Sequence, residues 1–91
     1  MLLHLVVAPN CDCVAVFDDP GDAQKHIDGL GENGLFIKDQ EVQGYQTGAA
    51  VFEVHAEGEQ PILFTNFGAA TNHIKGRKGT PVKVTVNVHQ A

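Results

Sequence analysis

The chain has 91 residues, with 6 Lys and Arg against 11 Asp and Glu, and a formal net charge of −5. This length suits one small domain, and the acidic balance argues against a general role on nucleic acid or anionic lipid, where basic surfaces supply the affinity. No apolar run reaches the roughly 18 residues of a membrane helix, and the first residues lack the basic flank of a signal peptide, so we expect a soluble, cytoplasmic protein.

The chain begins with a predicted β-hairpin. Leu2–Val7 and Val14–Phe17 are apolar and rich in β-branched residues, and a short turn that contains Pro9 and Asn10 joins them. Short apolar runs bounded by turn residues are typical of strands, and a short connection favours antiparallel neighbours.

A short helix and a third strand follow the hairpin. Asp19 can cap the helix through its carboxylate, and Pro20 suits the first helical position. Gly31 offers the left-handed conformation that ends many helices, and the strand after the helix is predicted at Leu35–Val42. The apolar stripe of the helix consists of Ala23, Ile27 and Leu30.

The second half of the chain has the same order of predicted elements. Gln43–Gly48, with two glycines, is the expected boundary between the halves. Val51–Ala56 and Ile62–Phe64 are predicted to form a second hairpin. The helix that starts at Asn66 contains glycine, threonine and asparagine, which are poor helix formers, so we expect only one or two turns before Gly76.

The last predicted strand has the clearest two-residue period of the chain. Every second residue of Val82–Val88 is valine, and polar residues stand between the valines. Such alternation predicts a strand with one buried face and one solvated face. We therefore expect Val84 and Val86, in the middle of that face, to be fully buried.

Two segments of the chain resemble each other. Phe17–Gly29 and Phe64–Gly76 align without a gap at a shift of 47 positions and share six of thirteen residues, where chance would give about one. We therefore predict an internal duplication within a single domain, residues 1–91, with pseudo-repeats at 1–43 and 48–91.

The predicted fold class is α+β. Each half-repeat contributes strand, strand, helix and strand, and the two together form one mainly antiparallel sheet with two short helices. The pattern allows this sheet to stay open or to curl toward a barrel, because sheet closure leaves the alternation of side chains unchanged.

The aligned positions His26 and His73 are the candidate ligand-binding residues. One interpretation is that each imidazole packs between its helix and the sheet. The other is that both open on one pocket that binds a small molecule, an anion or a metal. We assign no catalytic residue, because no nucleophile, base and orienting group can be placed together.

The loop after the second helix holds half of the basic residues. Lys75, Arg77 and Lys78 stand beside Gly76 and Gly79 and could bind phosphate or an acidic partner. The alternative is a solvated loop, because the spacing matches no phosphate-binding motif.

Cysteines and aromatic residues provide weaker candidates. Cys11 and Cys13 are separated by one residue, whereas structural zinc sites usually have a wider gap and need two more ligands, so packing is the alternative. Tyr45 and Phe67 stand among polar residues and glycines and are candidates for an interface, although Phe67 could instead fold into the core.

We expect a non-enzymatic binding protein that acts on a protein partner as an inhibitor or regulator and associates as a homodimer. Small size, acidic charge, the lack of a catalytic motif and available sheet edges favour this function. The alternative is a small-molecule or metal-binding protein with its ligand between the half-repeats. An enzyme that uses the histidines ranks last, and no cofactor is expected.

Overall fold

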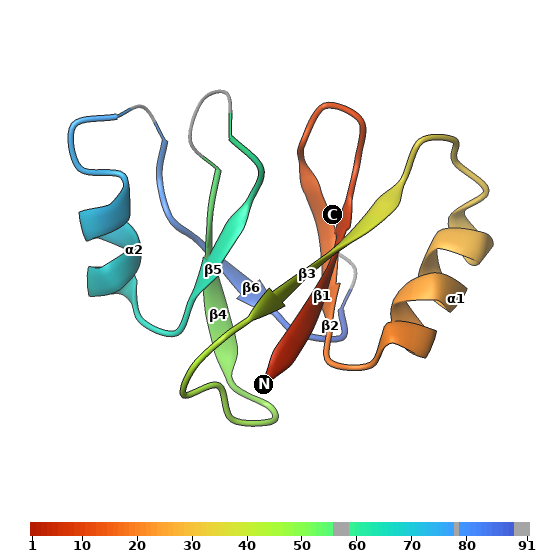
Figure 1. Ribbon diagram of the computed structural model, residues 1–91, viewed down its shortest axis with the longest axis horizontal. Coiled ribbons are helices and arrows are strands. Elements are labelled where there is room, and N and C mark those ends of the chain that lie inside the picture. Colours follow the sequence, from red (N-terminus) through yellow and green to blue (C-terminus); the bar gives the residue numbers. More distant parts are fainter. Residues whose placement is uncertain (56–58, 78, 89–91) are drawn as a thin grey trace.

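The computed structural model describes residues 1–55, 59–77 and 79–88. Both halves have the order strand, strand, helix, strand, as expected for an α+β chain (Figure 1). The elements are β1 (Leu2–Val7), β2 (Cys13–Phe17), α1 (Pro20–Leu30), β3 (Phe36–Glu41), β4 (Ala50–Val54), β5 (Ile62–Phe64), α2 (Phe67–His73) and β6 (Val82–Thr85). A common origin of the two halves stays a prediction.

The strands form two sheets, and the single sheet expected from the sequence is wrong. The strand orders are β2-β1-β3 and β5-β4-β6, and all pairs are antiparallel. Each half therefore pairs its own three strands, with β1 and β4 in the middle. No closed barrel forms among the residues that the structure describes, because the backbone ladder of each sheet ends after three strands.

The two sheets pack face to face, and one helix covers the outer face of each (Figure 1). The middle strands thus have apolar neighbours on both faces. The core between the sheets consists of Leu3, Leu5, Val7, Val16, Val42, Tyr45, Val51, Leu63, Val84 and Val86. The core under α1 consists of Val6, Ala15, Phe17 and Ala23, and the core under α2 of Val54, Ala70 and Ile74.

Both helices begin with a side-chain cap, and the cap predicted at Asp19 is confirmed. Asp19 Oδ1 accepts a hydrogen bond of 2.7 Å from the backbone N–H of Gly21, and Asn66 Oδ1 accepts one of 2.7 Å from Ala69. Gly31 ends α1 with a φ of 64°. The two helices have 11 and 7 residues. Within the described ranges, neither is long and apolar enough to cross a membrane.

The last strand is shorter than its valine pattern predicts. Val84 and Val86 are 2% and 8% exposed, which confirms their burial. Val82 and Val88 are 52% and 50% exposed, so the expectation of a buried valine face along the whole segment is wrong. The strand ends at Thr85, and Asn87 then adopts a left-handed φ of 68° that redirects the chain.

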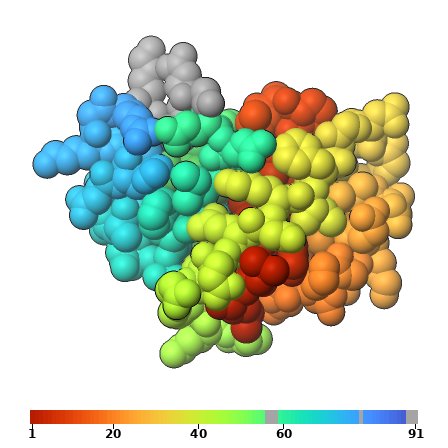
Figure 2. Space-filling model, in the orientation of Figure 1, coloured from red at the N-terminus to blue at the C-terminus, as the bar shows by residue number. Residues whose placement is uncertain are grey.

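The outer edge of β3 lies beside β5, and side chains bridge this β3–β5 seam. Gln40 Nε2 donates to the carbonyl of Leu63, and the N–H of Leu63 donates to Gln40 Oε1, both over 2.9 Å. Lys38 Nζ donates to the carbonyl of Pro61 over 2.7 Å. Figure 2 shows the atoms of β3 and β5 in contact on this face. Gln40 thus satisfies both backbone groups of an edge residue, as a further strand would.

The edges of β2 and β6 form a second, β2–β6 seam. The N–H of Asn87 donates to the carbonyl of Val16 over 2.7 Å, and Asn87 Oδ1 accepts from the N–H of Asp18 over 3.2 Å. All four edge strands therefore face another strand of the same molecule. This arrangement corrects the expectation that the sheet edges stand open along their length for a partner.

Candidate functional site: a cleft between the two sheets

A cleft of about 550 Å³ lies between the start of β2, the end of β4 and β6, at the part of the β2–β6 seam away from Asn87. Both halves of the chain contribute to it. The cleft is lined by Asp12, Cys13, Val14, Glu53, His55, Thr80, Val82 and Val84. It therefore combines an apolar wall with three ionisable side chains and a thiol.

Two of the three ionisable side chains of the cleft lie on the inner face of the second sheet: Glu53 in β4 and His55 directly after it. Side chains alternate along a strand, so Glu53 and His55 follow Val51 on the face that points toward the first sheet. The matching face of β1 carries Leu3, Leu5 and Val7, all with 0% exposure. The middle strands of the two sheets thus differ in polarity on the same, inner face.

Glu53 is a buried carboxyl group at the floor of the cleft. The residue is 8% exposed, but its carboxyl oxygens are not among the fully buried, unpartnered side-chain atoms of the described residues, which are the Tyr45 hydroxyl and His73 Nε2; they face the cleft. Burial raises the pKa of Glu53 above its usual 4.5; His55 opposes this shift and Asp12 adds to it. Withdrawal of a carboxyl group from bulk water costs free energy, whether it is neutral or charged.

His55 and Asp12 face each other across the cleft. His55 Nδ1 lies 3.7 Å from Asp12 Oδ1, and the side chains are 30% and 67% exposed. Asn10 orients Asp12: its Oδ1 accepts from the N–H of Asp12 over 3.1 Å, and its Nδ2 donates to Asp12 Oδ2 over 2.9 Å. The turn before β2 thus places a solvated carboxylate beside the imidazole.

Cys13 is a protonated thiol at the edge of the cleft. Its Sγ donates to the carbonyl of Ala15 over 3.6 Å. Burial raises the pKa of Cys13 to about 12, and the nearby Glu53 acts in the same direction. Because the thiolate is the reactive form, this thiol is a poor nucleophile and a poor metal ligand at neutral pH.

The structure gives the two cysteines different positions. Cys11 has a left-handed φ of 70° in the turn between β1 and β2, and neither cysteine is in a disulfide. Within residues 1–55, 59–77 and 79–88, no three His, Cys, Asp or Glu side chains are placed to hold a metal ion. The described residues therefore form no three-ligand metal site that includes Cys11 or Cys13.

The structure does not bring His26 and His73 together. The His26 ring lies 5.2 Å from that of Phe17, under α1, and the His73 ring lies 5.3 Å from that of Phe64, under α2. The two contacts are alike, but they lie on opposite outer faces with both sheets between them (Figure 1). The expectation of one pocket lined by both rings is therefore wrong. Each histidine instead makes its own contact between a helix and a sheet.

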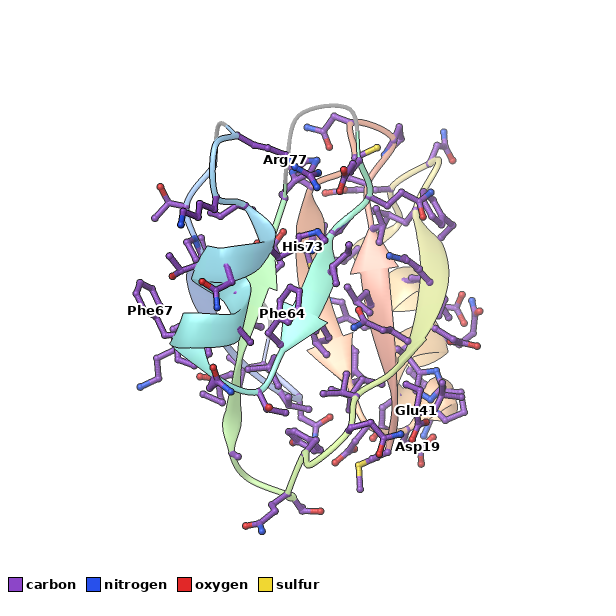
Figure 3. The ribbon with its side chains drawn as sticks, turned by 60° about the vertical axis from the view of Figure 1, so that its left-hand side comes forward. Asp19, Glu41, Phe64, Phe67, His73 and Arg77 are labelled. Carbon is purple, nitrogen blue, oxygen red and sulfur yellow. The ribbon has the colours of Figure 1, made fainter. Side chains whose placement is uncertain are left out.

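His73 instead meets the basic loop. Its Nε2 is buried without a hydrogen bond, 3.7 Å from Glu59 Oε2, and Arg77 pairs with the other oxygen of Glu59. Figure 3 shows His73 and Arg77 on the α2 side. Lys75 is exposed, and Lys78 lies outside the described residues. Arg77 is thus already paired, and anion binding by this loop stays a prediction.

The two aromatic candidates have opposite surroundings. Tyr45 is 8% exposed and belongs to the core between the sheets, so its expected place in an exposed interface is wrong. Phe67 is 55% exposed, and its ring lies edge-on to Phe52 with 5.8 Å between the centroids. The loop before β4 carries Tyr45 back over the inner core.

The sequence analysis singled out none of Asp12, Glu53 and His55. A strand with one solvated face would expose Glu53 and His55, and only the second sheet makes their face an interior one. The available signal is their spacing: both share a strand face with Val51, so two ionisable groups stand where β1 has only apolar residues.

Comparisons of this chain with family models, with curated proteins and with solved structures found no match. The fold and the site define a small α+β domain with two sheets face to face and a mixed polar and apolar cleft between them. The function is therefore argued from the cleft itself.

Proposed function

We propose that this protein is a non-enzymatic small-molecule-binding protein that holds its ligand in the cleft between the two half-repeats. The observation that carries the proposal is the cleft of about 550 Å³. Ligand pockets are commonly about 300–1,000 Å³, and mostly apolar with a few polar groups that orient the ligand. The valine wall and the few polar side chains match this description.

The residues of the cleft favour binding over catalysis. A raised pKa keeps Cys13 protonated, and His55 lies beside Asp12 rather than beside a nucleophile. Binding needs only shape and complementary groups, which the cleft supplies. The proposal includes a cytoplasmic location, to which two unpaired cysteines are suited, and a common origin of the half-repeats.

Native mass spectrometry of freshly purified protein tests the proposal. We expect a bound species that denaturation releases and that Val82→Trp lacks, because indole at this half-exposed position fills the mouth of the cleft. Phe36→Trp, at a partly exposed position of β3, is the matched control and should retain the species. Equal retention by both variants would reject the cleft as the binding site.

A second candidate function is binding of a protein partner, as inhibitor or regulator or as a homodimer. The specific observation is Phe67, a 55% exposed ring at the first position of α2. Exposed aromatic residues are enriched in interfaces. Sedimentation velocity should then show a dimer or complex that Phe67→Ala weakens and Phe36→Ala does not; a monomer at all concentrations, with no complex, would speak against it.

A further inference from the structure

The buried carboxyl group of Glu53 is the feature of the cleft that packing does not explain. In β1 the corresponding middle-strand position, flanked on both sides by ladder partners, is Leu5. Glu53 has the same kind of position, between Leu63 and Val82. Leucine there buries apolar surface, whereas the carboxyl of a residue with 8% exposure is largely withdrawn from bulk water and faces the cleft, which lowers stability. A ligand that donates to this carboxyl would remove that cost.

The charges around the cleft indicate what kind of donor fits. Among the described lining residues there are two carboxyl groups, Asp12 and Glu53, one imidazole, His55, which lies beside Asp12, and neither lysine nor arginine. Lys38 lies near enough to lower the pKa of Cys13, but its ammonium is held by the carbonyl of Pro61 across the β3–β5 seam. The field in the cleft therefore attracts cations and repels anions.

The valines beside the carboxyl groups determine what the rest of the ligand contacts: Val82 is the cross-strand neighbour of Glu53. Val14, Val82 and Val84 supply apolar surface, and Val82 is 52% exposed. An apolar group of the ligand that covers this valine would increase the affinity, because it removes the valine side chain from water. A bare metal ion does not use such a wall, and the described side chains hold no three-ligand metal site.

We infer that the ligand is a small organic cation, with an ammonium or guanidinium group that pairs with the Glu53 carboxylate and an apolar body against the valine wall. This inference rests on the proposed function. Asp12, at the mouth, attracts the cation during entry, and Glu53 holds it at the floor through a charge-assisted hydrogen bond. Pairing with a cation also favours the ionised form of Glu53.

Three probes that share a phenyl ring and differ in charge test the inference: 2-phenylethylamine, 2-phenylethanol and phenylacetate. Each is titrated at pH 7 into ¹⁵N-labelled protein, and the shifts of the backbone amides of Glu53, His55 and Thr80 are followed. We expect the amine to bind about tenfold or more tightly than the alcohol, since a charge-assisted hydrogen bond is roughly twice as strong as a neutral one. Phenylacetate should leave these amides unmoved.

Glu53→Gln keeps the size of the side chain and removes its charge, so it should abolish the preference for the amine over the alcohol. Glu32→Gln, at an exposed site outside the cleft, should retain the full preference. Asp12→Asn provides a second variant at a 67% exposed side chain, where folding is not at risk, and should weaken amine binding by about two- to fivefold because the interaction is solvated.

The outcomes separate the inference from the proposed function. Equal binding of amine and alcohol, unchanged in Glu53→Gln, would overturn the organic cation and leave the cleft as a binding site. Tighter binding of phenylacetate would overturn it in the same way. If no probe moves the cleft amides, the inference and the proposed function both fail.

Discussion

The two seams of this molecule join equivalent pairs of strands, yet one is bridged along its length and the other opens into a cleft. In the β3–β5 seam, Lys38 and Gln40 reach from β3 to backbone groups beside and within β5. In the β2–β6 seam the ladder positions that match them are Val82 and Val84. The side chain of valine cannot donate or accept, so Val82 and Val84 cannot bridge this seam as Lys38 and Gln40 bridge the other one, and Asn87 bonds it at the far end.

In the middle strands the distribution of polar and apolar side chains is the reverse of that in the edge strands. Leu5 of β1 lies behind the bridged seam, and Glu53 of β4 lies behind the open one. The first sheet thus carries its polar side chains on the edge strand, where they close the seam. The second sheet carries them on the middle strand, where they line the cleft. The same framework can therefore be closed or open, depending on which strand has the polar residues.

The largest effect is expected when the polarity of the middle strand is copied from β4 to β1. Leu5→Glu should lower the free energy of unfolding by about 4–6 kcal/mol, because it removes a buried leucine and leaves a carboxyl in a closed interior. Urea denaturation measures the change, with Leu5→Met as the volume-matched control at under about 1.5 kcal/mol. A loss as small as that of the control would show that both seams admit water.

The bridge across the closed seam gives the next effect. Gln40→Ala should lower the free energy of unfolding by about 2–3 kcal/mol, since it leaves the N–H and carbonyl of Leu63 without partners. Asn87→Gly, which keeps the left-handed φ of the other seam, should cost about 1 kcal/mol through one lost side-chain bond. Equal losses in urea denaturation would contradict the difference between the seams.

Placing the apolar residue of β1 at the matching position of β4 should have a smaller effect on stability, and this effect should be stabilising. Glu53→Leu replaces a carboxyl largely withdrawn from bulk water by the residue that β1 has, and we expect a gain of about 1–2 kcal/mol in the free energy of unfolding. Thermal unfolding followed by circular dichroism reports the gain. Destabilisation instead would mean that Glu53 has a structural partner in the folded protein.

The smallest effect concerns pH. The raised pKa of Glu53 means that the folded state binds its proton more tightly than the unfolded state does, so stability falls as pH rises above the usual 4.5 through the folded pKa. Asp12, Cys13 and His55 face the same cleft. The difference in free energy of unfolding between Glu53→Gln and wild type should therefore increase from pH 4 toward neutrality. A difference that stays constant would exclude the shift.

Much of the local structure was predictable because it depends on neighbours in the chain. Asp19 and Asn66 cap helices through backbone groups two or three residues away, and apolar runs between turn residues predicted the hairpins. The burial of Val84 and Val86 followed from their period of two. The site was not predictable in this way, since Asp12, Glu53 and His55 come from two halves that meet only in the folded protein.

The sequence by itself determined the order of the elements, the caps and the alternation of each strand, because those follow from interactions within a few residues. Only the tertiary structure decided that six strands divide into two sheets, that His26 and His73 lie on opposite outer faces, and that Tyr45 lies in the core. A period of two shows that a strand has two faces, but not which layer covers each face. The second sheet makes the face of Glu53 an interior one, and that contact gives the carboxyl its burial and the protein its cleft.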